Sequence, residues 1–109
     1  MTLSQEQVNA ILSSKKGSVT FHGFVLRNIN LSHRDLQGVF FAGIIIDNVN
    51  FRNSNLSHAS FYGSLIERTD FSFSILDKTV FRDSIISQSS FVGIKANFLK
   101  KAYLMLKNY

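Results

Sequence analysis

Every fifth residue between Phe21 and Phe91 is apolar, and this spacing constrains the fold more than any other feature of the sequence. Fifteen consecutive positions follow it without exception: Phe21, Leu26, Leu31, Leu36, Phe41, Ile46, Phe51, Leu56, Phe61, Ile66, Phe71, Leu76, Phe81, Ile86 and Phe91. On a helix of about 3.6 residues per turn such a series would spread around all sides, and on a flat strand it would alternate between two faces. The side chains can share one core only if the backbone turns by a similar angle at each repeat, which predicts a solenoid of very short strands and turns.

The side chains at these positions favour a coil of four repeats. Residues that are twenty positions apart are alike, as in the series Phe21, Phe41, Phe61 and Phe81 and the series Leu26, Ile46, Ile66 and Ile86. A coil of three repeats would stack unlike shapes, whereas a close-packed interior favours like on like. A spacing of ten residues would also separate aromatic from aliphatic side chains, so the central residues alone leave the number of sides open.

Three stretches resemble the repeat of the pentapeptide-repeat family, which is approximately Ala, Asp or Asn, Leu or Phe, and two polar residues. They are Ser54-Asn55-Leu56-Ser57-His58, Thr69-Asp70-Phe71-Ser72-Phe73 and Ala59-Ser60-Phe61-Tyr62-Gly63. The resemblance covers about residues 19–94. It implies an all-β solenoid, a right-handed four-sided β-helix of about four coils.

The family also places a small, inward-facing residue two positions before each centre. The residues that comply are Ala59, Ser64, Thr69, Ser74, Thr79, Ser84 and Ser89. Phe24, Arg34 and Ile44 do not, so the first coil is expected to be the least regular. We expect Arg34 to force a local bulge there.

Short helical caps are predicted at both ends of a single domain that spans residues 1–109. Ser4 and Gln7 have the spacing of a capping box, and Val8, Ile11 and Leu12 follow at helical spacing. We therefore expect an N-terminal cap in residues 1–17 with a helix over 5–14, coils over 18–94, and a C-terminal helix within 95–109. The N-terminal helix would cover strand edges that otherwise invite pairing with other chains.

The net charge of +5 belongs to the two ends of the chain. Six basic and six acidic residues cancel between Phe21 and Ile94, whereas six lysines against Glu6 lie outside that stretch. The neutral coils disfavour DNA mimicry, and the few scattered basic residues disfavour direct nucleic-acid binding.

A vertical row of apolar residues is predicted on one outer side of the solenoid. The residues just before the centres on this side are Val25, Ile45, Leu65 and Ile85, where the family usually has a polar residue. Phe40, Ile75 and Val80 are further exceptions on other sides. Exposed, contiguous apolar surface marks a contact site. The alternatives are that a terminal segment folds back over the row, or that β-branched residues stabilise the strands.

The C-terminal helix has three interpretations. Asn97 is a candidate N-cap, and the helix then carries Phe98, Leu99, Ala102, Tyr103, Leu106 and Tyr109 near one side, with lysines elsewhere. The helix is predicted to close the last coil, to form a homodimer, or to lie on a membrane surface as a basic amphipathic helix. The resemblance favours pairing, because family members that resist gyrase inhibitors dimerise end to end through their C-terminal segments.

The sequence contains no catalytic, metal-binding or cofactor-binding constellation. His22, His33 and His58 fall on three different sides of the coil, no carboxylates pair as acid–base catalysis requires, and there is no cysteine. No apolar stretch is long enough for a transmembrane helix, and the first residues lack a signal-peptide layout.

We therefore expect a non-enzymatic interaction or scaffold module in the bacterial cytoplasm. It would bind an unidentified protein, or itself, through Val25, Phe40, Ile45, Leu65, Ile85, Tyr103 and Leu106, with no small-molecule substrate. The alternatives are a bacterial effector domain that recognises a host protein in the host cytosol, and DNA-mimic protection of topoisomerase, which the charges disfavour.

Overall fold

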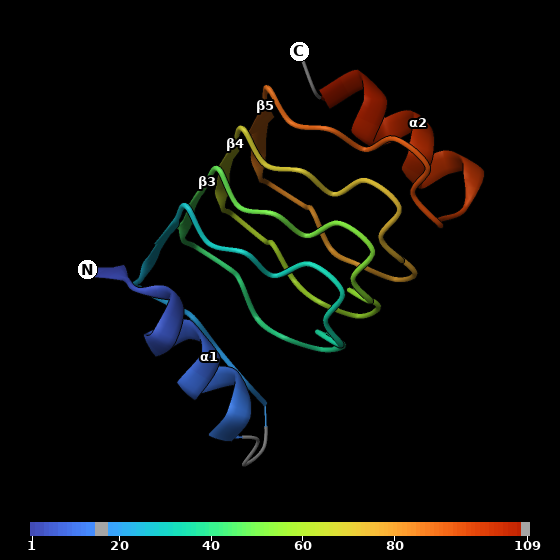
Figure 1. Cartoon of the computed structure of the whole chain (residues 1–109). Helices are drawn as coiled ribbons and strands as arrows, with labels where there is room; N and C mark the ends of the chain where they lie inside the picture. Colours follow the sequence, from blue (N-terminus) through green and yellow to red (C-terminus); the bar gives the residue numbers. More distant parts are fainter. Residues whose placement is uncertain (15–17, 108–109) are drawn as a thin grey trace.

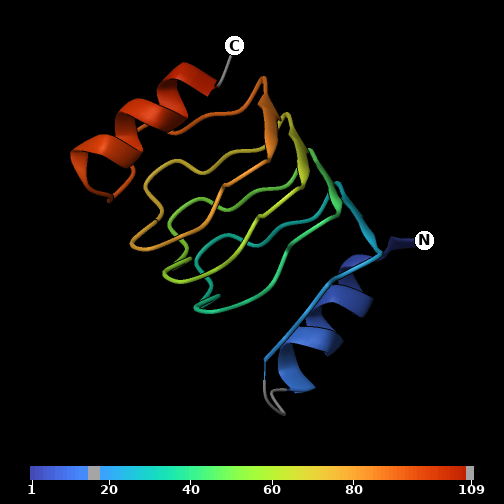
Figure 2. The ribbon, with the colours of Figure 1, turned by 180° about the vertical axis from the view of Figure 1, so that it is seen from behind.

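A computed structural model of the chain describes residues 1–14 and 18–107, and in the last helix the side chains of residues 98 and 105–107 lie outside this description. The chain winds into coils that stack into a column, with one helix at each end (Figures 1 and 2). The principal extents are 34 × 22 × 21 Å.

Each coil takes twenty residues and has four sides. One side is a parallel sheet that includes β2 (Val25–Arg27), β3 (Ile45–Asp47), β4 (Leu65–Glu67) and β5 (Ile85–Ser87). Its strands pair in steps of twenty, so that Val25 lies beside Ile45, Ile45 beside Leu65 and Leu65 beside Ile85. The other three sides are held by isolated bridges with the same step, such as Thr20 with Phe40, Asn30 with Asn50, and Asp35 with Asn55. This pairing shows that each coil has four sides, a number that the central residues alone had left open.

Two stacks of phenylalanine rings fill the axis of the column. In the first stack, the ring centroids of Phe41 and Phe61 are 4.9 Å apart, and those of Phe61 and Phe81 are 5.0 Å apart. The second stack contains Phe51, Phe71 and Phe91 and meets the first edge to face, with 5.5 Å between the centroids of Phe61 and Phe71. Offset and edge-to-face contacts suit the ring quadrupole, so the predicted like-on-like packing is confirmed.

Small polar residues two positions before the centres are buried, as predicted. Ser64 Oγ donates to the carbonyl oxygen of Phe41 at 2.6 Å, and Thr79 Oγ1 donates to that of Leu56 at 2.8 Å. These bonds satisfy hydroxyl groups that would be costly to bury without a partner. These two bonds also connect one coil to the preceding coil.

Arg34 does not bulge the first coil, contrary to the prediction. Its carbonyl oxygen accepts the Asn55 N–H at 2.9 Å, so the backbone hydrogen bonds between the first and second coils continue at Arg34. Its own N–H donates to Ser54 Oγ at 3.2 Å, and its guanidinium donates to Asn9 Oδ1 in the N-terminal helix at 2.8 Å. A long side chain fits here because a helix, and not another coil, lies below it.

The N-terminal cap combines a strand, a helix and one side-chain amide. The helix α1 spans Gln5–Ser14 as predicted, and its capping box is formed by Gln7 N–H donating to Ser4 Oγ at 3.1 Å and Ser4 N–H donating to Gln7 Oε1 at 2.8 Å. Strand β1 (Thr2–Leu3), which was not predicted, pairs in parallel with β2. Gln5 pairs with Asn30 as a peptide unit would, since its Oε1 accepts the Asn30 N–H at 2.7 Å and its Nε2 donates to the Asn30 carbonyl at 2.9 Å.

The C-terminal helix α2 spans Phe98–Lys107 and lies across the last coil (Figure 1). Asn97 is its N-cap, because Asn97 Oδ1 accepts the Lys100 N–H at 2.9 Å. Both helical caps are therefore present. The predicted apolar position Tyr109 lies outside the described residues.

Candidate protein-interaction surface

An aliphatic stripe, defined as Val25, Ile45, Leu65 and Ile85, runs along the outer face of β2–β5. Each member directly precedes an inward-facing central residue, so its side chain points away from the core. Ile45 is 38% exposed and Ile85 66%, whereas Val25 and Leu65 are half-buried by their neighbours. On the side of the coil that follows the sheet, the equivalent positions are polar: Asn30, Asn50, Asp70 and Ser90.

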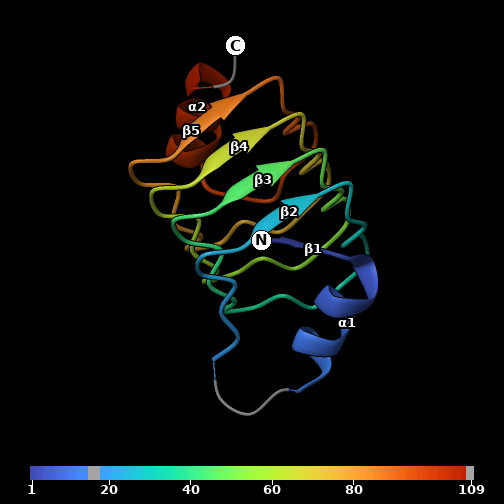
Figure 3. The ribbon, with the colours of Figure 1, turned by 90° about the vertical axis from the view of Figure 1, so that its left-hand side faces the viewer.

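Neither terminal helix covers the stripe. Figure 3 looks onto the sheet and shows α1 and α2 at its two ends, with nothing drawn in front of β2–β5. Two consecutive apolar residues in each strand are typical of parallel sheets that are covered on both faces. The four strands have this composition, yet one of their faces meets solvent. The alternative in which a terminal segment folds back over the stripe is therefore wrong for the described residues.

An ionic cluster borders the stripe on one side. Asp47 accepts from Arg27 Nε at 3.0 Å and from Arg68 Nη2 at 2.6 Å, so opposite charges pair between coils. Asp47 is buried beneath these two half-exposed arginines. Burial opposes its ionisation, but the hydrogen bonds and positive charges of Arg27 and Arg68 outweigh it and hold the pKa of the carboxyl below its usual value. The cluster links three coils next to the apolar surface.

Phe40 belongs to a different side of the coil from the stripe. It bridges Thr20 and Ser60 and is 44% exposed. Tyr62, at the corner that leads from this side into β4, is also exposed. Phe40 and Tyr62 therefore add exposed aromatic side chains outside the stripe.

Helix α2 buries a different side from the one predicted. Leu104 is fully buried, whereas Leu99, which was assigned to the apolar side, is 78% exposed. Lys100 explains the difference, because its ammonium group donates to the carbonyl oxygens of Leu76, at 3.2 Å, and Thr79. Burial lowers the pKa of Lys100, an effect that the nearby carboxylate of Asp77 opposes.

Tyr103 lies on α2 at the edge of this contact. Its hydroxyl donates to the Phe81 carbonyl at 3.3 Å, and the residue is 39% exposed. The side chain of Leu106, the remaining predicted contact residue, lies outside the described part of the helix. The structure therefore brings four of the seven predicted residues together in the stripe and places Phe40 and Tyr103 on adjoining surfaces.

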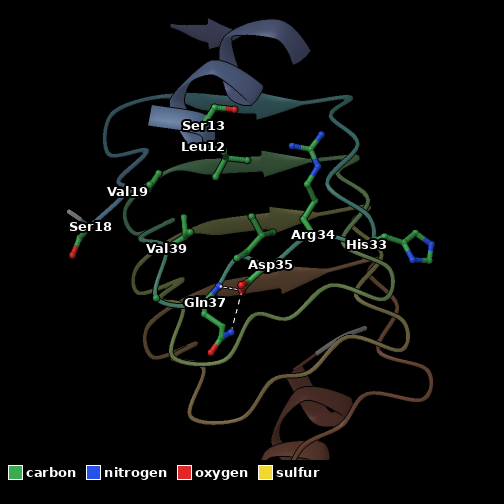
Figure 4. Close-up of a pocket in the computed structure, with 11 residues that line it drawn as sticks. Leu12, Ser13, Ser18, Val19, His33, Arg34, Asp35, Gln37 and Val39 are labelled. Carbon is green, nitrogen blue, oxygen red and sulfur yellow. Dashed lines mark hydrogen bonds between the residues drawn. The ribbon is translucent and has the colours of Figure 1, made fainter. Parts of the chain in front are cut away.

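A groove of about 640 Å³, which was not predicted, lies between the end of α1 and the first coil (Figure 4). Leu12 and Val19 contribute apolar surface, and Asp35 Oδ1 accepts a hydrogen bond from Gln37 Nε2 at 3.1 Å. His33 points away from the groove in this view. The lining comes from three separate segments, so no local sequence signal could have indicated it.

No metal or membrane-spanning element is found in the part of the chain that the structure describes. Within residues 1–14 and 18–107, no three His, Cys, Asp or Glu side chains gather as a metal site requires. No described helix has the length and apolar character needed to cross a bilayer. His33 and His58 occupy exposed corners of the coil with φ of 57° and 61°.

Comparison with known sequences and structures identifies the repeat. The pentapeptide-repeat profile matches residues 25–63 with eight copies. No curated protein sequence matches the chain. A trypsin-treated variant of QnrB1, a plasmid-mediated fluoroquinolone resistance protein, is similar over 76% of this chain and 45% of its own, with 18% identity and a TM-score of 0.56.

Two further solved structures are similar at lower scores. The pentapeptide repeat protein Rfr23 from the cyanobacterium Cyanothece matches 74% of this chain and 50% of its own, with 19% identity and a TM-score of 0.43. A pentapeptide repeat protein from the Arabidopsis thaliana thylakoid lumen matches 82% and 66%, with 18% identity and a TM-score of 0.34. The chain spans about half the length of the first two proteins. The predicted right-handed, four-sided β-helix is confirmed.

Proposed function

We propose that this chain, whose residues 25–63 match pentapeptide repeats, is a non-catalytic module that binds a protein through the aliphatic stripe. The observation that carries the proposal is the uncovered outer face of β2–β5, whose four apolar rungs lie in register. Exposed apolar surface of this kind is removed from water when a partner docks.

The size of the stripe indicates what the partner must contact in addition. Three steps of about 4.8 Å make it roughly 14 Å long, and three-residue strands make it about 10 Å wide. A stable interface buries about 800 Å² on each partner, which is more than this area provides. The partner would therefore also contact neighbouring residues, and Phe40 and Tyr103 are exposed next to the sheet and at the end of the column.

The charge distribution does not favour the alternative of DNA mimicry. A protein that imitates DNA must present rows of negative charge, whereas the acidic and basic residues between 21 and 94 are equal in number. Beside the stripe, Asp47 is neutralised by Arg27 and Arg68. The similarity to QnrB1 is at 18% identity and supports the fold alone.

The absence of cysteine allows a site-specific test of the stripe. In Ile45→Cys, a thiol-reactive benzophenone would be attached to the middle of the stripe, and the protein would be irradiated in the cells or extract that produce it. The matched control is Lys95→Cys, because Lys95 is exposed and occupies the equivalent position on the opposite side.

We expect a discrete cross-linked protein of higher mass from Ile45→Cys and none from Lys95→Cys. Competition by unlabelled wild-type protein should reduce the yield, whereas competition by Ile85→Asp should not. Equal labelling from both positions, or no adduct from either, would contradict the proposal.

A further inference from the structure

The side of the first coil that contains Asp35 presents an open strand edge to the groove at the end of α1. On two other sides the N-terminal segment provides the pairing that a preceding coil would give, because β1 pairs with β2 and the Gln5 amide pairs with Asn30. Within residues 1–14 and 18–107, neither the backbone N–H nor the carbonyl oxygen of Asp35 has a hydrogen-bond partner. Unpaired backbone groups at an edge are a template for a further strand.

The next coil shows how a strand would pair with this edge. Asn55 lies one coil above Asp35, donates its N–H to the Arg34 carbonyl at 2.9 Å and accepts the Leu36 N–H at 2.8 Å. A strand added below Asp35 in the same parallel register would place one residue opposite Asp35. The residue before that one would accept the Asp35 N–H, and the residue after it would donate its N–H to the Asp35 carbonyl.

The apolar lining of the groove defines one side chain of the added strand. Side chains alternate along a strand, so the residues before and after the one opposite Asp35 would point inward. The later of the two would lie below Leu36, which is buried, and would meet the apolar surface that Leu12 and Val19 contribute to the groove. A large apolar residue is therefore expected at this position.

The charge of Arg34 defines the other inward side chain. Arg27, Arg52 and Arg68 each pair with a carboxylate, whereas no described carboxylate pairs with Arg34. Its guanidinium donates to the neutral Asn9 Oδ1 at 2.8 Å, and a guanidinium has further N–H donors. Because Arg34 is half-buried, its attraction to an anion is screened less than that of an exposed arginine.

The carboxylate of Asp35 does not serve this arginine. Asp35 Oδ1 accepts hydrogen bonds from the Gln37 N–H at 3.2 Å and from Gln37 Nε2 at 3.1 Å. In Figure 4 the side chain of Arg34 extends toward α1, on the end of the column where the added strand would lie. Charge complementarity therefore favours aspartate or glutamate in the residue below Arg34, and the net charge of +5 favours the approach of an acidic segment.

We propose that this groove binds an extended segment of a partner protein, which adds a parallel strand to the edge at Asp35. The segment has an acidic residue, any residue and then a large apolar residue. Main-chain hydrogen bonds give affinity in this mode of binding, and alternate side chains give specificity. The groove of about 640 Å³ is within the roughly 300–1,000 Å³ of typical binding clefts. It is a second surface, separate from the aliphatic stripe, and its small contact area makes the binding weak and transient.

Amide NMR spectra of isotope-labelled protein, recorded during titration with short peptides, test the proposal. The probe is a hexapeptide with blocked ends and the sequence Ser-Glu-Val-Leu-Ser-Ser, used at up to millimolar concentration. We expect saturable shifts at Asp35, Leu12 and Val19, and slower solvent exchange of the Asp35 N–H, because it gains an acceptor. A peptide with glutamine in place of glutamate should bind about tenfold more weakly, because a hydrogen bond to a charged group is lost.

A chemical change in the peptide and a change in the protein test the two contacts separately. Methylation of the leucine nitrogen removes the donor to the Asp35 carbonyl and should abolish binding at an unchanged charge. Arg34→Gln should bind the glutamate and glutamine peptides equally. Arg82→Gln, an identical change at an exposed position on another side, should keep the tenfold preference. Circular dichroism would show whether Arg34→Gln is folded, and Arg34→Lys, which keeps the charge, replaces it if it is not and should keep a preference for glutamate.

Four outcomes would contradict the proposal. Equal binding of the two peptides by wild-type protein would overturn the role of Arg34, and full binding of the methylated peptide would overturn strand addition at Asp35. The absence of any shift at millimolar peptide would overturn the site. Shifts confined to β2–β5 would also overturn it, and would support the aliphatic stripe as the surface that binds the peptide.

Discussion

Replacing Phe61 with alanine should remove a large part of the stability of the column. Phe61 is fully buried, is stacked 4.9 Å from Phe41 and 5.0 Å from Phe81, and meets the rings of Phe51 and Phe71 edge to face. Truncation of a buried phenylalanine costs about 3–5 kcal/mol. Phe61 has four aromatic neighbours, and each aromatic pair contributes about 0.5–1.5 kcal/mol beyond burial. The cost of its truncation should therefore lie near the upper end of the range for a buried phenylalanine. The free energy of unfolding of a typical domain is about 5–15 kcal/mol, so the expected loss is at least about a quarter of it.

The free energy of unfolding would be measured by urea titration with far-UV circular dichroism. Phe73→Ala is the matched control, because Phe73 is 42% exposed and its ring contacts the Arg52 guanidinium at 5.2 Å from the centroid. Loss of such an exposed cation–π contact costs about 0.5–1 kcal/mol. The reasoning would be refuted if Phe61→Ala lost no more stability than Phe73→Ala while the slope of the unfolding free energy against urea concentration stayed the same in both variants.

Three further predictions concern the ionic cluster, the C-terminal helix and one corner of the coil. The pKa of Asp47 is lowered in the folded protein, so its stabilising contribution is present above the unfolded value of about 3.9 and is lost as pH falls through the folded value. Urea midpoints between neutral and strongly acidic pH should therefore fall less steeply in Asp47→Asn, and parallel curves would contradict this. Lys100→Met should cost about 1–3 kcal/mol, since hydrogen bonds from a charged group are lost, and should speed amide exchange in α2. Lys101→Met, at an exposed position, should do neither. Gly93→Ala should destabilise more than Gly63→Ala by thermal unfolding, although both residues have positive φ. A Cβ at Gly93 would lie 2.5 Å from Phe73 Cδ1, whereas one at Gly63 meets nothing within 4 Å. The difference should disappear when Phe73 is also alanine.

The features that follow from the repeat could be predicted from the sequence. A strict five-residue spacing predicts that fifteen apolar side chains share one core only if the chain winds into a coil. The likeness of residues twenty positions apart favoured four repeats per coil, and the pairing of Val25 with Ile45 and of Ile45 with Leu65 agrees with it. The capping box of Ser4 and Gln7 was also predictable, because its two hydrogen bonds depend only on residues three positions apart.

Features that depend on the ends of the column could not be predicted in the same way. Strand β1 has two residues and no repeat, and it forms because the edge of β2 offers unpaired backbone groups. The buried side of α2 differed from the predicted one because Lys100 finds carbonyl acceptors on the last coil, which no helical pattern indicates. Because α2 turns Lys100 toward the last coil, Leu99 is left exposed, and this orientation of the helix became apparent only in the structure.

The position of the aliphatic stripe depends on one claim, that residues twenty positions apart are neighbours on the same side of the column. A double variant with Ile45→Cys and Leu65→Cys tests it directly in a chain that has no other cysteine. Adjacent strands lie about 4.8 Å apart, so a short bis-thiol reagent should join the two thiols within one molecule. The pair Asn50→Cys and Leu65→Cys, whose members would be neighbours in a coil of fifteen residues, should not react. Efficient bridging of positions 50 and 65, with none between positions 45 and 65, would contradict the four-sided coil and the stripe together.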